Sequence, residues 1–280
     1  MEKYYHFTSV DTLYNMLTSS LIVVDDTNCK YIEFWATGIN ALNDTTERDL
    51  FVNALIKEVR QYANNKGNTL TSEQEKELGR LCYTDLYVIS LTGSNLSVSD
   101  ELNMWRGYGG NGSGVCIEFD FSKVQPINPI GINAFQMEDK YVLRECEYLM
   151  PEDITLKQDL IMQIYDALFI HEKDNMKTTV YMAGIIARIA KLSPYYKHKA
   201  YESEHEWRIV KYSLEQPKYR KRGDLIIPYI TYRIPVTAIT SVKIGPCIKS
   251  TFIIDNLVSF IYKKLGPNIE IKYSDIPYRG

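Results

Sequence analysis

The chain has 280 residues and a formal net charge of -3, which allows one large domain or two small ones and provides no bulk basic field for nucleic acid. Its 5 cysteines and 4 histidines are scattered without paired spacing, which excludes a disulfide framework and a zinc site and indicates a reducing cytoplasm. No apolar run is long enough to span a bilayer, so no membrane partner is expected.

The first part of the chain predicts short strands and helices. Strands are indicated by short apolar runs, and helices by apolar residues at intervals of three and four. The expected strands are 3–9, 21–24, 32–36 and 86–91, and the expected helices are 10–18, 47–63 and 72–82. The first helix places Leu13, Met16 and Leu17 on one stripe, and Ser9 or Asp11 can cap it.

The densest glycine and aromatic stretch is 100–114, DELNMWRGYGGNGSG. Its glycines permit positive φ and a close approach of the backbone to a partner. The stretch fits neither of the phosphate-binding glycine patterns at a helix start. Two interpretations stay open: a loop that cradles a phosphate, and a wide hairpin turn with Trp105 and Tyr108 as core residues beneath it.

The second half of the chain is richer in strands and is interrupted by helices. The expected strands are 115–120, 141–148, 225–234, 239–244 and 269–273, and the expected helices are 155–192, broken near 171–175, and 251–265. The basic run 218–223 is expected to be a solvated hairpin tip, and it would be the first place to look for phosphate contacts with a nucleic acid.

These elements indicate an α+β fold that is mainly antiparallel, because strands and helices do not alternate regularly. The chain has no internal repeat and no low-complexity linker. We therefore expect a single α+β domain over 1–280, with a helical insertion at about 151–195.

The stretch 201–210, YESEHEWRIV, is expected to be a strand. With a period of two, Glu204, Glu206 and Arg208 share one face, and Trp207 lies on the other. The polar face is either a site of chemistry or a solvated row with weak ion pairs.

Several residue types in this chain suit cleavage of the glycosidic bond to nicotinamide in NAD. That bond breaks through a cation-like sugar state, so the site needs positioning and a nearby negative charge. A histidine and a hydroxyl can hold the ribose, an aromatic ring can stack on the nicotinamide, and a carboxylate can stabilise the cation. The chain offers His6 and Thr8, Trp105 and Tyr108, and Glu204 and Glu206 for these roles.

Short motifs occur in a specific order along nearly the whole chain. They are Tyr5-His6-Phe7-Thr8-Ser9, Leu42-Asn43-Asp44-x-x-Glu47, Ile89-Ser90-Leu91, Met104-Trp105-x-x-Tyr108, Gly114 to Phe119, Lys199 with Glu204-x-Glu206-x-Arg208, and Ser274-x-Ile276-Pro277. This set resembles a bacterial family of unknown function, DUF2971, which is associated with mobile-element and phage-defence neighbourhoods. One departure is Thr45, where that family usually has Pro, and it touches only a loop.

A histidine and a threonine on the first strand, followed by a late strand glutamate, also resemble the ADP-ribosyltransferase superfamily. That superfamily has a His, an aromatic and an acidic residue on three separate strands; here the aromatic residues lie in the glycine-rich stretch instead. The resemblance implies a split β core of that superfamily's type and NAD as substrate. It implies a toxin or phage-defence effector that modifies a nucleic acid or protein target or hydrolyses NAD; a partner protein encoded nearby is a further expectation.

The residues to which this resemblance assigns roles fall into two groups. The implied catalytic residues are Glu206, with Glu204 in reserve, and His6. The implied NAD-binding residues are His6, Thr8, Ser90, Trp105, Tyr108 and Arg208.

Two other classes of function fit the same sequence. A non-enzymatic ligand-sensing or partner-binding module of a defence system would use the same cleft without turnover. A metal-dependent nuclease would use a cluster of carboxylates, namely Asp44, Glu202, Glu204 and Glu206. His6 also has a purely structural interpretation as a core residue at a strand end, and Arg208 has one as the ion-pair partner of Glu206.

Overall fold

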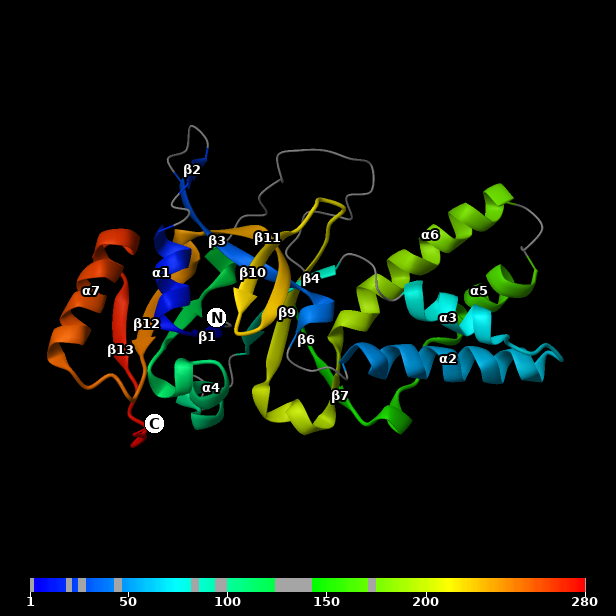
Figure 1. Ribbon diagram of the computed structural model, residues 1–280, viewed down its shortest axis with the longest axis horizontal. Helices are drawn as coiled ribbons and strands as arrows, with labels where there is room; N and C mark the ends of the chain where they lie inside the picture. Colours follow the sequence, from blue (N-terminus) through cyan, green and yellow to red (C-terminus); the bar gives the residue numbers. More distant parts are fainter. Residues whose placement is uncertain are drawn as a thin grey trace.

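The computed structural model describes residues 3–18, 22–24, 29–42, 47–81, 86–93, 100–123, 143–170 and 175–279. The helices are α1 (Val10–Thr18), α2 (Glu47–Asn65), α3 (Ser72–Leu81), α4 (Leu102–Gly107), α5 (Gln158–Phe169), α6 (Asn175–Leu192) and α7 (Thr251–Leu265). The strands are β1 (Tyr4–Thr8), β2 (Ile22–Val24), β3 (Cys29–Gly38), β4 (Leu86–Thr92), β5 (Val115–Phe119), β6 (Leu143–Glu145), β7 (Glu147–Leu149), β8 (Tyr196–His198), β9 (Glu206–Tyr212), β10 (Lys218–Arg222), β11 (Leu225–Pro235), β12 (Ile239–Ile244) and β13 (Glu270–Tyr273). Figure 1 shows an elongated molecule, with α2, α3, α5 and α6 together at one end and the sheet over the rest.

An 11-stranded sheet dominates the fold, with the order β10-β11-β3-β4-β1-β5-β12-β13 along its main path. Off this path, β2 pairs with β3, and β9 pairs with both β4 and β6. The described pairings in this sheet are antiparallel except for β12 with β13. The prediction of an α+β fold with mainly antiparallel strands is confirmed.

The first strand of the chain lies inside the sheet rather than at its edge. β1 pairs with β5 along its whole length and meets β4 where Tyr5 lies opposite Thr92. Its side chains are buried except that of His6, which is half-buried. This central position fixes His6 among strands that come from later parts of the chain.

The main apolar core lies between the sheet and the helices α1 and α7. α1 presents the predicted stripe of Leu13, Met16 and Leu17 to this core. Ser9 Oγ accepts a hydrogen bond from the Thr12 backbone N–H at 3.1 Å, so the predicted N-cap is confirmed. The strand side of the core is made of β-branched and aromatic residues such as Ile32, which is fully buried.

A second apolar core joins α2, α3, α5 and α6. Phe51 and Leu55 of α2 are 0% exposed, as are Leu160 of α5 and Ile189 of α6. Helices from 47–81 therefore pack with those of the predicted insertion in one cluster. Among the described residues, no helix combines the length and the apolar character needed to cross a membrane.

The prediction of an open loop or hairpin turn over 100–114 is wrong. The stretch forms α4 and a short 3-10 turn, η3 (Gly110–Gly112). The helix is short, but tertiary packing stabilises it, because Trp105 is 0% exposed and its indole N–H donates to Asp100 Oδ1 at 2.9 Å.

Two other predictions on the polar half of the chain also need correction. The strand expected at 201–210 begins only at Glu206, because the chain before it forms a 3-10 helix, η7 (Lys199–Glu204), followed by His205 with φ 44°. The basic run expected as a hairpin tip is the strand β10, and the turn after it contains Gly223 with φ 58°.

Smaller differences concern boundaries. The strand predicted over 141–148 is divided at Cys146 into β6 and β7. Predictions for residues 21, 43–46, 82, 141–142 and 171–174 fall outside the described residues.

Candidate functional site

A cavity of about 430 Å³ opens beside β4, within the ~300–1,000 Å³ typical of small-molecule sites. β9 pairs with β4 along all of β4, which leaves β4 one other edge. β3 takes one end of that edge, at Tyr87 and Val88, and β1 takes the other end, at Thr92. The cavity is lined by residues of all three strands, so it lies where β1 and β3 diverge.

All but one of the predicted site residues line this cavity. The residues that line it are His6, Thr8, Ser90, Tyr108, Glu204, Glu206 and Arg208. Trp105 does not line it: its ring packs edge-on against Phe7 with centroids 5.0 Å apart, in the apolar cluster under α4. The core interpretation therefore describes Trp105 fully, whereas Tyr108 packs against the same cluster and also lines the cavity.

The sheet brings the two ends of the candidate site together. Tyr5 lies opposite Thr92, and Thr92 lies opposite Glu206. β1 and β9 are therefore two strand spacings apart, about 10 Å, although they are far apart in sequence.

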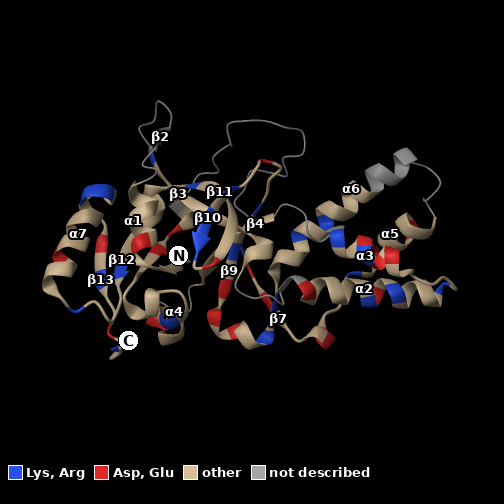
Figure 2. Ribbon diagram, in the orientation of Figure 1, with Lys and Arg blue, Asp and Glu red and all other residues tan. Residues whose placement is uncertain are grey.

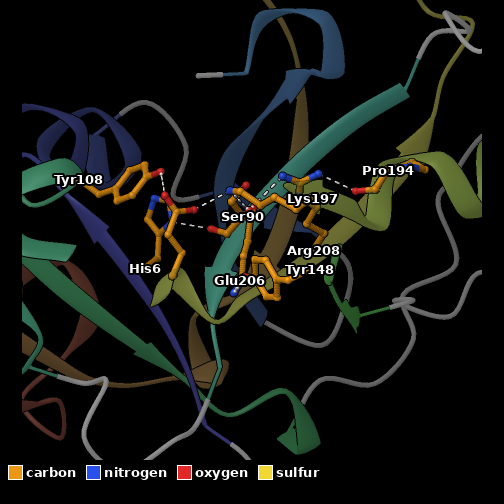
Figure 3. A network of polar contacts seen from close by, with 9 residues as sticks. His6, Ser90, Tyr108, Tyr148, Pro194, Lys197, Glu206 and Arg208 are labelled. Carbon is orange, nitrogen blue, oxygen red and sulfur yellow. Dashed lines mark hydrogen bonds and ion pairs between the residues drawn. The ribbon is translucent and has the colours of Figure 1, made fainter. Parts of the chain in front are cut away.

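Glu206 and Arg208 form a buried ion pair on one face of β9 (Figure 3). Arg208 Nε donates to Glu206 Oε1 at 2.8 Å, Nη2 donates to Oε2 at 3.0 Å, and Nη1 donates to the Pro194 carbonyl at 2.6 Å. Arg208 is only 1% exposed and Glu206 5%. The prediction of a solvated charged face is wrong, because both faces of β9 are covered at this point.

Lys197 of β8 joins the two glutamates, and the sequence had not singled it out. Its Nζ donates to Glu204 Oε2 and to Glu206 Oε2, both at 2.5 Å. Burial alone would raise the pKa of Glu206, but the charges of Arg208 and Lys197 and their hydrogen bonds lower it to about 2. A lysine between two aromatic residues on a short strand gives no periodic signal from which this role could be predicted.

Glu204 lies nearer the surface than Glu206 and contacts the glycine-rich stretch. Its side chain is 16% exposed, whereas that of Glu206 is 6% exposed. The Tyr108 hydroxyl donates to Glu204 Oε1 at 2.7 Å. Burial raises the pKa of Tyr108, and the negative charge of Glu204 raises it further, so the phenol remains a proton donor.

His6 is neutral and has a defined tautomer. Its Nδ1 lies 3.1 Å from the Ser90 carbonyl oxygen, which can only accept, so Nδ1 carries the proton. Burial lowers the pKa of His6, the bond to Ser90 raises it in part, and the charge of Arg220 lowers it further. Nε2 is therefore left as an acceptor on a ring that lines the cavity.

Within the glycine-rich stretch, Gly107 and Gly110 line the cavity, whereas Gly114 does not. A Cβ on Gly114 would lie 2.2 Å from the Thr8 carbonyl oxygen and 2.7 Å from that of Gly109. A Cβ on Gly245 would lie 2.4 Å from the Gly112 carbonyl oxygen. The close approach that Gly114 permits is therefore to the protein's own backbone.

Arg220 and Arg222 also line the cavity, and the sequence had placed them in a solvated tip. Arg220 Nη2 donates to Thr37 Oγ1 of β3 at 2.9 Å, and its guanidinium lies 5.5 Å from the centroid of the Trp35 ring. Alternation along β10 was the signal that could have found them, because it places both arginines on one face.

The described carboxylates proposed for a nuclease, Glu202, Glu204 and Glu206, do not all line the cavity. Glu202 is exposed and does not line the cavity, and Asp44 lies outside the described residues. Within the described ranges, no group of three or more His, Cys, Asp or Glu side chains could hold a metal ion.

Comparison with known proteins bears on part of this site. The family model described as "Protein of unknown function (DUF2971)" matches residues 104–209, so the resemblance seen in the motifs is confirmed for this range. The range includes Tyr108 and Glu204 but not His6. No curated protein and no solved structure matches the chain.

Proposed function

We propose that the chain is an NAD-cleaving, ADP-ribosyltransferase-like enzyme whose active site is the cavity beside β4. The observation that carries the proposal is that His6, Tyr108 and Glu204 come from three distant parts of the chain and line one cavity. The family resemblance adds the setting, a toxin or defence effector that acts on a nucleic acid or protein target or hydrolyses NAD.

Glu204 is the better choice for the catalytic carboxylate, although the sequence favoured Glu206. Both oxygens of Glu206 bind Arg208, and Lys197 also binds one of them. A carboxylate held in this way has little negative charge left to stabilise a cationic sugar. Glu204 has one cation and one neutral hydroxyl as partners and is more exposed.

The remaining residues have positioning roles in this proposal. The Nε2 atom of His6 would accept a hydrogen bond from a ribose hydroxyl, and the Thr8 hydroxyl would bind the same ribose. The Tyr108 ring would pack on the nicotinamide while its hydroxyl orients Glu204. Lys197 and Arg208 would hold the Glu206 side chain in place. Their positive charges would also offset the repulsion between the carboxylates of Glu204 and Glu206.

The test measures the release of nicotinamide from NAD by chromatography. Wild type should release it, and Glu204→Gln should reduce the rate by at least about 100-fold, as expected for loss of one charge aligned with the transition state. Glu202→Gln is the matched control, because Glu202 is on the same 3-10 helix but exposed. Absence of release by wild type, together with no rise in melting temperature with NAD, would rule the proposal out.

A non-enzymatic ligand-sensing module is a second candidate, and one observation favours it. Every carboxylate oxygen of Glu204 and Glu206 already accepts a hydrogen bond from a side chain of the protein. Such a site is built to be rigid rather than reactive. This candidate predicts that NAD raises the unfolding free energy by RT ln(1 + [L]/Kd), and with it the melting temperature, in wild type and in Glu204→Gln alike, without nicotinamide release.

A further inference from the structure

The strand β10 contributes two arginines to the lining of the cavity. Arg220 and Arg222 alternate on this strand with Tyr219 and Lys221, so the two arginines face one side. Figure 2 shows the blue of Lys and Arg over most of β10, which lies next to β11 in the middle of the molecule. Both arginines line the cavity, whereas Lys221 does not.

The Arg220 guanidinium is only partly satisfied by the protein. Nη2 donates to Thr37 Oγ1, and the plane of the group lies over Trp35. Its Nε is buried and has no hydrogen-bond partner. Within the described part of the chain, no carboxylate pairs with Arg220. A buried donor of a cation without an acceptor is costly, and native structures rarely leave one without a reason.

The lining of the cavity is rich in charged side chains. Its described lining contains four cations, Lys197, Arg208, Arg220 and Arg222, but two carboxylates, Glu204 and Glu206. Lys197 and Arg208 are the cations that bind these carboxylates. Two of these four cations, Arg220 and Arg222, come from β10. Burial lowers the pKa of Arg220, and the neighbouring charge of Arg222 lowers it further, so these arginines repel each other.

We propose that Arg220 is the anion-binding residue of the cavity, and that it binds the phosphate or pyrophosphate group of a phosphorylated ligand. The planar guanidinium offers Nε–H and a second N–H as a fork, the geometry that matches phosphate oxygens. Thr37 holds one arm of the group and Trp35 supports its face, so the fork is oriented before the ligand arrives. Two arginines on the same strand suit a ligand group that carries more than one negative charge, such as pyrophosphate, better than they suit a single carboxylate.

With this subsite, the phosphate and the sugar of one ligand would contact different residues of the same cavity. The phosphate would bind at β10, and a sugar hydroxyl would reach the acceptor Nε2 of His6. Both Arg220 and His6 line this cavity. The subsite requires the cavity but not the bond cleavage proposed above.

The experiment uses calorimetric titration of the full chain with inorganic pyrophosphate and with ADP-ribose. Wild type should bind both, and Arg220→Met should weaken both by about 10-fold or more, as expected for loss of a hydrogen bond between charged groups. Arg220→Lys keeps the charge but lacks the fork, and it should also weaken binding. Lys221→Met is the matched control, because it removes the same charge from the exposed face of the same strand, and it should leave affinity unchanged.

Each alternative result overturns the proposal. No binding of pyrophosphate by wild type at millimolar concentration would do so, as would an equal loss in Lys221→Met, which would indicate a general charge effect. Malonate binding as tightly as pyrophosphate, with the same dependence on Arg220, would replace phosphate by carboxylate as the ligand. Since pyrophosphate has no glycosidic bond, none of these results depends on nicotinamide release. If Arg220→Met does not fold, Arg220→Lys decides.

Discussion

Replacing Glu206 by Gln removes a negative charge that two buried cations share. The side chains of Glu206, Arg208 and Lys197 are 6%, 2% and 5% exposed. After the substitution, Glu204 is the one carboxylate left in the network described above. Removing one partner of a buried ion pair typically costs about 3–5 kcal/mol, because the other charge stays buried without compensation.

The pKa of Glu206 gives a second route to the magnitude. It is about 2 in the folded protein and 4.5 ordinarily, a difference that corresponds to about 3 kcal/mol of unfolding free energy. Because the folded state has the lower pKa, this stabilisation is fully present above about pH 5 and is lost as the pH falls toward 2. The two routes agree in order of magnitude.

Urea unfolding of wild type and Glu206→Gln, monitored by circular dichroism, measures the effect. Near pH 7 the variant should be less stable by about 3 kcal/mol, and near pH 3 the difference should shrink by about 2 kcal/mol. Glu202→Gln, at an exposed position, should match wild type at both pH values. A difference below about 1 kcal/mol near pH 7, or one that does not change with pH, would refute this reasoning and return Glu206 to the catalytic candidates.

Other substitutions test the packing behind the cavity. Trp105→Ala should lower the unfolding free energy by about 3–5 kcal/mol, because the ring is 0% exposed; an unchanged melting temperature would contradict the anchoring of α4. Gly114→Ala should destabilise the protein strongly, because its Cβ would lie 2.2 Å from the Thr8 carbonyl oxygen, whereas Gly107→Ala in α4 has nothing within 4 Å and should be neutral or slightly stabilising. Equal melting temperatures for the two alanine variants would show that the backbone approach at Gly114 is not tight.

Local signals predicted the elements that depend on local interactions. Ser9 and the stripe of Leu13, Met16 and Leu17 lie within one short segment, so the cap and buried face of α1 could be read directly. α4 could not be predicted in the same way. Its glycines indicate a loop, and what stabilises it is the contact between Trp105 and a strand nearly a hundred residues earlier.

The candidate site was predicted in its residue types but not in its electrostatics. The motifs pointed to His6, Tyr108 and the late glutamates, and the antiparallel sheet brings them to one cavity. Whether Glu206 is solvated or buried depends on what covers β9, which no pattern within the strand reveals. Arg220 was missed for the converse reason, since a run of basic residues is typical of solvent-exposed chain. The other four residues of β10 are indeed exposed, and Arg220 alone is partly buried.

The second apolar core has a consequence for the order of events during synthesis. α2 and α3 are complete by residue 81, but α5 begins only at residue 158 and α6 ends at residue 192. At a translation rate of roughly 5–20 residues per second, the ribosome needs on the order of ten seconds to supply those later helices. During that interval the apolar side of α2, which includes Phe51 and Leu55, has no native partner from α5 or α6. The nascent chain therefore exposes this apolar surface transiently. During this interval a chaperone could bind it, or it could aggregate with another chain.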